Sequence, residues 1–116
     1  MYDDQPPRMD PYSRHVLVCT GGYCSSERRG RAVYAHLAKL LQREDLLYGP
    51  GRVKRSEAPC LGVCAGGPIL AVYPDGIWYG GVTPELLERI VVEHLRDGRP
   101  VEEAIFHRLA PPTPRA

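Results

Sequence analysis

The chain has 116 residues, 15 basic and 14 acidic, and its net charge of +1 argues against nucleic acid or a membrane surface as the main partner, since both favour a basic excess. One domain of this length buries roughly two thirds of the surface of its unfolded chain, which suffices for a core without disulfide bonds. No segment approaches the ~20 apolar residues of a membrane span, and the polar N-terminus is unlike a signal peptide, so we expect a cytoplasmic protein.

The first half of the chain predicts a tail, a strand and a helix. Residues 1–13 carry three prolines and no apolar periodicity, which indicates a flexible tail. Residues 15–18 are a short apolar run that predicts a buried strand ending at Cys19. After Cys24, a capping serine and apolar residues spaced as on one helix face predict a helix that ends before residues 49–51.

The second half predicts a hairpin and a second helix. Residues 52–56 are mostly charged and weakly predict an edge strand, whereas residues 68–73 are apolar on both faces and predict a central strand. A Pro-Asp-Gly turn joins that strand to a returning strand at residues 77–81. A capping Thr83 then begins a helix that Gly98 closes.

The C-terminal part is less informative. Residues 101–109 contain apolar side chains without a clear period, and residues 110–116, with three prolines, should form a flexible tail. The order strand, helix, strand, loop, strand, strand, helix is typical of a thioredoxin-like α/β fold, with a mixed β-sheet of four to five strands and two main helices. We therefore expect one domain over residues 14–109 between two tails.

The four cysteines form two close pairs, Cys19 with Cys24 and Cys60 with Cys64, each in a glycine-rich loop. In a reducing compartment such pairs more often bind metal or act catalytically than form disulfides. Zinc sites usually have narrower spacings than this combination, and dithiol oxidoreductases most often separate their cysteines by two residues. A [2Fe-2S] cluster needs two thiolates on each iron, which two separate pairs can supply, and glycines leave backbone N–H groups free to approach its sulfurs.

The segment that begins with the second pair resembles the thioredoxin-like [2Fe-2S] ferredoxins. It consists of Cys60-x-x-x-Cys64, Gly67-Pro68, an apolar strand, Tyr73-Pro74-Asp75-Gly76-x-Trp78-Tyr79-Gly80 and Pro84-Glu85, within a resemblance that spans about residues 15–104. The resemblance implies a thioredoxin-like fold, a homodimer and a surface [2Fe-2S] cluster with Cys19, Cys24, Cys60 and Cys64 as ligands. The spacing of the first pair is similar to that in the cluster domain of the small subunit of respiratory NADH dehydrogenase.

We therefore expect a small soluble one-electron carrier with one [2Fe-2S] cluster and no catalytic site of its own, acting on redox partner proteins alone or within a larger oxidoreductase. A zinc-binding structural or adaptor module and a thiol–disulfide reductase of thioredoxin type remain alternatives. The loop of Cys60 and Cys64 has no charged residue as far as position 73, and we expect it to be the more exposed. Three arginines after the first pair, Arg28, Arg29 and Arg31, either dock an acidic partner or form a solvated helix end.

Three smaller expectations concern single residues. Trp78 and Tyr79 are adjacent, so they should face opposite sides of the sheet. His94 lies on the apolar stripe of the second helix and should be a packed histidine rather than a ligand. The bond between Gly67 and Pro68 is equally compatible with the cis and trans forms.

Overall fold

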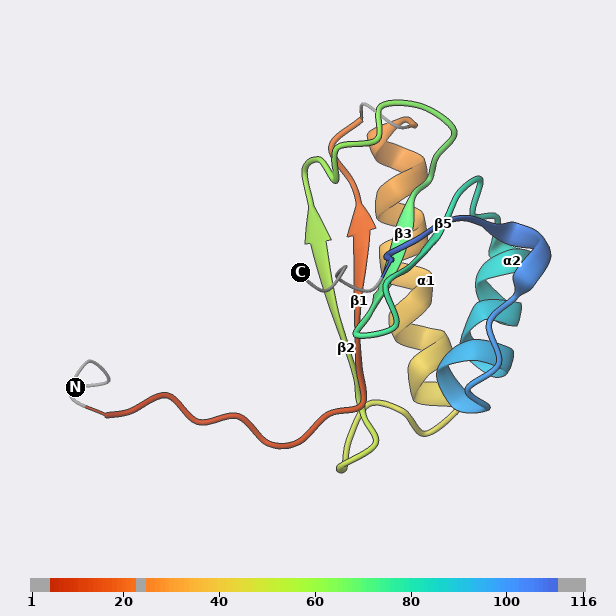
Figure 1. Ribbon diagram of the computed structural model, residues 1–116. Helices are drawn as coiled ribbons and strands as arrows, with labels where there is room; N and C mark the ends of the chain where they lie inside the picture. Colours follow the sequence, from red (N-terminus) through yellow and green to blue (C-terminus); the bar gives the residue numbers. More distant parts are fainter. Residues whose placement is uncertain (1–4, 23–24, 111–116) are drawn as a thin grey trace, which may run out of the picture.

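The computed structural model describes residues 5–22 and 25–110 as one mixed sheet with helices packed against it (Figure 1). The elements are β1 (Arg14–Cys19), α1 (Glu27–Arg43), β2 (Val53–Ala58), β3 (Leu70–Tyr73), β4 (Ile77–Tyr79), α2 (Pro84–Arg89), its continuation η2 (Ile90–Arg96), the short 3-10 helix η3 (Glu102–Ala104) and β5 (Ile105–Arg108). The sheet has five strands in the order β2-β1-β3-β4-β5. Strands β1 and β2 run parallel, and the other neighbouring pairs are antiparallel. The expected α/β class with a mixed sheet is confirmed.

Strand burial follows position in the sheet. β3 lies at the centre, and Leu70, Ala71 and Val72 are all fully buried, as the apolar run predicts. β2 lies at one edge and buries only Val53, which confirms the weak edge-strand prediction. β5 forms the other edge and was not assigned from the sequence, because its residues after Ile105 are all exposed and show no alternation.

The two main helices begin and end where their capping residues predict. The Ser26 side chain accepts a hydrogen bond from the Arg29 N–H and caps α1. Thr83 caps α2 in the same way by accepting from the Leu86 N–H. Gly98 closes the second helix with a φ of +76°. Between Ile90 and Arg96 this helix has wider π-helical turns, which its sequence does not reveal.

The main hydrophobic core of the described residues lies between the sheet and both helices. It contains Val16, Val18, Leu70, Val72, Ile77 and Tyr79 from the sheet and Val33, Leu37, Leu40, Leu41, Leu87, Ile90, Val91 and Leu95 from the helices. Since both helices pack into this one cluster, they cover the same face of the sheet. Tyr79 is fully buried in the core, whereas its neighbour Trp78 lies half-buried on the opposite face, which confirms the expected alternation.

The ends of the described chain extend beyond the sheet. Ser13 donates its N–H to the Arg52 carbonyl, and Arg52 donates to the Asp10 and Pro11 carbonyls, so this segment lies along the start of β2. The division into a domain at residues 14–109 and two tails stays a prediction. The Gly67–Pro68 and Tyr73–Pro74 bonds are cis. No helix among the described residues is both long and apolar enough to cross a bilayer.

Candidate metal centre

The two cysteine loops lie at the same end of the sheet. Because β1 and β2 are parallel, the loop after Cys19 and the loop after Ala58 leave the sheet at the same end of the strands. The antiparallel strand β3 begins at that end. In Figure 1 the loop between β2 and β3 arches over the ends of β1 and α1. The structure therefore brings Cys19 close to the loop of Cys60 and Cys64, while the fourth predicted ligand, Cys24, lies outside the described residues.

Backbone contacts join the two loops. The Thr20 N–H donates to the Ala58 carbonyl over 2.9 Å, and the Cys19 Sγ lies 4.0 Å from the Pro59 carbonyl oxygen. A Cβ on Gly21 would lie 1.6 Å from that same Pro59 oxygen. Only glycine allows this approach, so the residue type at position 21 determines how closely the loops pack.

Side chains of the second loop alternate between solvent and protein. Cys60 and Cys64 are exposed and Cys19 is only 1% exposed, so the expectation that this loop is the more exposed is confirmed relative to Cys19. Leu61 and Val63 are partly buried and pack against a small apolar cluster formed by Cys19, Ile69 and Trp78. The loop thus presents two thiols outward on an apolar base that separates them from the sheet.

Backbone hydrogen bonds hold the C-terminal end of the second loop, and the loop has an internal sulfur contact. Gly81 donates its N–H to the Gly66 carbonyl over 2.7 Å, and Val82 donates to the Pro68 carbonyl over 3.1 Å. Within the loop, the Gly62 N–H donates to the Cys60 Sγ over 3.2 Å. Such N–H donors stabilise a thiolate and tune any metal that it binds.

These residues fit a soft metal or an iron–sulfur cluster. Thiolates bind soft metals and iron–sulfur clusters, and a backbone N–H already donates to one of the two exposed sulfurs. Among residues 5–22 and 25–110, no three Cys, His, Asp or Glu side chains converge to hold a metal ion. Two of the histidines have other partners: His15 bonds to Ser56, and His94, which is fully buried, bonds to Asp75 and Tyr79. An all-cysteine site therefore needs a ligand from the segment around Cys24.

Sequence reasoning missed one residue that positions Cys19. Gly30 lies inside α1, and a Cβ there would be 2.5 Å from the Cys19 carbonyl oxygen. The helix consequently packs directly on the end of β1. The available signal was a glycine within a helical pattern, which costs roughly 1 kcal/mol relative to alanine and so suggests a packing reason.

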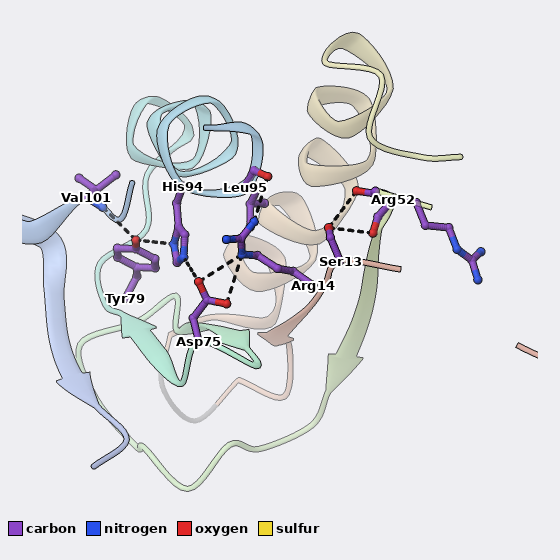
Figure 2. A network of polar contacts seen from close by, with 9 residues as sticks. Ser13, Arg14, Arg52, Asp75, Tyr79, His94, Leu95 and Val101 are labelled. Atoms are coloured by element: carbon purple, nitrogen blue, oxygen red, sulfur yellow. Dashed lines mark hydrogen bonds and ion pairs between the residues drawn. The ribbon is translucent and has the colours of Figure 1, made fainter. Parts of the chain in front are cut away.

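A polar network links β4 and the turn between β3 and β4 to the start of β1 and the second helix (Figure 2). The Nε2 of His94 lies 2.7 Å from Asp75, its Nδ1 lies 2.8 Å from the Tyr79 hydroxyl, and Tyr79 accepts from the Val101 N–H. Arg14 donates to both Asp75 oxygens. His94 is fully buried, which confirms that it is a packed histidine. Sequence reasoning placed Asp75 only in a turn and missed this role.

Burial and charge shift the pKa values in this network. Burial lowers the pKa of His94, and the hydrogen bond to Asp75 offsets only part of that effect. Burial alone would raise the pKa of Asp75, but the His94 hydrogen bond and the Arg14 charge outweigh it and leave that pKa below its usual value. Burial also raises the pKa of Tyr79 to about 12. At neutral pH the network therefore consists of a neutral imidazole, a neutral phenol and a carboxylate paired with Arg14.

Known proteins are similar to this chain in sequence and in fold, although no family model matches it. A ferredoxin from Aquifex aeolicus named "Ferredoxin, 2Fe-2S" is 34% identical over 107 residues, covering 85% of this chain and 94% of that protein. A protein of the same name from Clostridium pasteurianum is 35% identical over 96 residues, covering 76% of this chain and 90% of the relative.

Solved structures of a ferredoxin are also similar to this chain. The crystal structure of the wild-type thioredoxin-like [2Fe-2S] ferredoxin from Aquifex aeolicus has a TM-score of 0.73 and 32% identity, covering 84% of this chain and 99% of that one. Two further matches are variants of that ferredoxin in which serine replaces one or the other of two cysteines four positions apart. These likenesses confirm the thioredoxin-like fold. Because its sequence and its fold match these ferredoxins over most of the chain, the protein belongs to the thioredoxin-like [2Fe-2S] ferredoxin family.

Proposed function

We propose that the protein is a one-electron carrier that holds one [2Fe-2S] cluster through Cys19, Cys24, Cys60 and Cys64. Its relatives are named as [2Fe-2S] ferredoxins, which supports an electron carrier without a catalytic site. The observation that carries the proposal is the contact of the two cysteine loops at Gly21 and Pro59, because it brings Cys19 of the first pair beside the loop that carries the second pair. A bound cluster supplies the one-electron redox chemistry, and the protein supplies position and environment.

The described cysteines take different roles in this proposal. Cys60 and Cys64 hold the solvent side of the site, and Cys19 holds the side that faces the sheet. The Gly62 N–H places partial positive charge at the Cys60 sulfur, which favours the more reduced state. The cysteines replaced in the two Aquifex variants have the same separation as Cys60 and Cys64, which supports this pair as ligands.

Metal analysis of the purified protein tests the proposal. We expect iron and acid-labile sulfide in equal amounts, a reddish-brown colour and a reduced state with one unpaired electron. Replacing Cys60 or Cys64 with Ala should abolish the cluster or make it labile, because one iron loses a thiolate. Zinc in a colourless protein would support the adaptor alternative, and disulfide reduction without metal would support the reductase. Full retention of the visible spectrum in either variant would refute the ligand assignment.

We also propose that the protein is a homodimer built on the hairpin of residues 69–81. The face of the sheet opposite the helices carries an aromatic group around Trp78, with ring centres 6.5 Å from Tyr73, 6.5 Å from Phe106 and 6.3 Å from His107. Phe106 is 48% exposed beside this group. A second copy would cover the apolar surface that this face leaves in contact with water.

Light scattering during gel filtration tests the dimer. Phe106→Glu should yield monomers, whereas Tyr48→Glu, which changes a residue that is 84% exposed in the loop before β2, should leave the dimer intact. A monomeric wild-type protein at all practical concentrations would refute the proposal. A cytoplasmic location, and a choice between a free carrier and a subunit of a larger oxidoreductase, stay predictions.

A further inference from the structure

Arginines in the described chain mostly have acidic or backbone partners. The pairs are Arg14 with Asp75, Arg31 with Glu27, Arg43 with Glu44 and Glu88, Arg89 with Glu93 and Glu103, Arg96 with Glu44 and Asp97, Arg99 with Asp97, and Arg108 with Glu102. Two others, Arg52 and Arg55, donate to backbone carbonyls. Among residues 5–22 and 25–110, Arg8, Arg28 and Arg29 have no carboxylate within ion-pair distance.

Arg28 and Arg29 lie next to the first cysteine loop. They belong to the first turn of α1, the helix that packs on the Cys19 carbonyl through Gly30. Both side chains are exposed. The neighbouring Glu27 lies 3.9 Å from Arg31, so its charge is already compensated on that side of the helix. An uncompensated positive charge therefore remains at the end of the molecule that carries the cysteines.

A hollow of about 460 Å³ continues this surface between α1 and the start of α2. Arg29 and His36 line one side, and the remaining lining is mostly apolar: Ala32, Val33, Pro68, Val82, Thr83, Pro84 and Leu87. Pro68 is the residue at which the second cysteine loop ends, so Arg29 and that loop border the same depression. The surface combines cationic side chains with an apolar floor.

We propose that Arg28, Arg29 and this hollow form the docking surface for an acidic redox protein, an inference that rests on the proposed electron-carrier function. Arginine forms strong charge-assisted hydrogen bonds with carboxylates, and a local positive field raises the rate at which an anionic partner arrives. An apolar side chain of the partner would occupy the hollow. The uncharged loop of Cys60 and Cys64 at the same end then allows the partner to approach the thiols closely.

Among the described residues, no carboxylate lies within ion-pair distance of Arg28 or Arg29, and none lines the hollow. Glu57 is the last residue but one of β2, the edge strand whose Arg55 stacks on Tyr34 of α1, and it does not line the hollow. Glu85 is exposed in the first turn of α2 and does not line it either. The Arg28 and Arg29 side of the cysteine end is therefore the side suited to an acidic partner.

Electron transfer to small oxidants of opposite charge tests the proposal on the cluster-loaded protein. The probes are the anionic cobalt(III)–EDTA complex and cationic hexaamminecobalt(III), each of which takes one electron from the reduced protein and becomes cobalt(II). In stopped-flow measurements at low salt, Arg28→Gln with Arg29→Gln should slow the anionic oxidant about fivefold, and the difference should disappear at high salt. Poly-L-glutamate, an acidic macromolecule, should slow electron transfer from the wild-type protein to the oxidant and should not slow it in this variant.

The matched control is Arg8→Gln with Arg99→Gln, which removes the same charge from two exposed arginines remote from the cysteines. The proposal predicts wild-type rates and inhibition in this control. Equal behaviour of the two double variants, or equal inhibition of all three proteins by poly-L-glutamate, would overturn it. Absence of iron and sulfide would refute the proposed function instead, whereas a normal spectrum without charge discrimination would refute only the docking surface.

Discussion

The Nε2 atom of His94 lies 2.7 Å from the Oδ2 atom of Asp75, although one residue belongs to η2 and the other to the turn between β3 and β4. A carboxylate can only accept, so His94 carries its proton on Nε2 and its Nδ1 accepts from the Tyr79 hydroxyl. The Tyr79 oxygen accepts in turn from the Val101 N–H. One neutral imidazole therefore connects the hairpin turn, the second helix and the strand between them, with every donor matched to an acceptor.

Acid should destabilise the fold through His94. Because burial lowers its pKa in the folded state, the unfolded chain binds the proton more readily. The contribution of the neutral imidazole is complete above pH ~6.5 and is lost as the pH falls through the lower folded-state pKa. Asp75, whose folded-state pKa is also lowered, adds a further loss in more acidic solution. Urea unfolding at several pH values should show both.

A His94→Gln variant provides the control for that measurement. Its unfolding free energy should be lower at neutral pH and should change less between pH 7.5 and 5.5 than that of the wild type. The partly exposed His15 also has a lowered pKa, from burial and the nearby Lys54, so His15→Gln tests its share. A wild-type slope that survives in His94→Gln and vanishes in His15→Gln would contradict the assignment.

Tyr79→Phe should destabilise the protein without altering the metal site. The change leaves the Val101 N–H and the His94 Nδ1 buried without their partner, at a cost of roughly 1–3 kcal/mol. The visible spectrum of the loaded protein should remain that of the wild type, because Tyr79 is buried in the core on the helix side of the sheet, whereas Cys19 packs in the apolar cluster with Trp78 on the opposite face. Denaturant titration and spectroscopy on the same sample measure both effects, and a changed spectrum would argue against this separation.

Gly21→Ala should weaken the metal site directly. The added methyl group would occupy the position of the Pro59 carbonyl oxygen, so the two cysteine loops must move apart. Such overpacking typically costs about 1–3 kcal/mol, and we expect lower iron and sulfide content after purification. Gly51→Ala is the matched control, since a Cβ there meets no atom within 4 Å. Equal iron content in both variants would show that the loop contact is dispensable.

Ala65→Arg should slow electron exchange with a protein partner while leaving the spectrum nearly unchanged. Ala65 is exposed directly after Cys64, where a long charged side chain would hold a partner away from the thiols. The measurement is the rate of reduction by a purified partner at fixed salt. An unchanged rate would place the electron-transfer contact entirely on the side of Arg28 and Arg29.

Local sequence patterns predict the elements that depend on local physics. The central strand at Leu70–Tyr73 is apolar throughout, and Ser26 and Thr83 cap helices through contacts three residues away. Four cysteines in two close pairs likewise indicate a soft-metal site through their residue type and spacing alone. These features are predictable because the residues that cause each of them lie within a few positions of one another.

Long-range contacts could not be predicted in this way. The edge strand at Ile105–Arg108 is defined by pairing with β4 rather than by its own apolar pattern. The approach of Gly21 to Pro59 and the bond between Asp75 and His94 join residues far apart in the chain, and the residues around Gly21 and Asp75 do not indicate these partners. The positions of these residues follow from sheet order, which local sequence patterns do not reveal.

The alternation in the second cysteine loop has a consequence for its length. Cys60 and Cys64 face solvent, while Leu61 and Val63 face the protein, so the loop repeats every two residues. Inserting or deleting one residue between the cysteines would displace either a thiol from solvent or an apolar side chain from the base formed with Ile69 and Trp78. The apolar base beneath the loop therefore restricts the cysteine spacing independently of the metal.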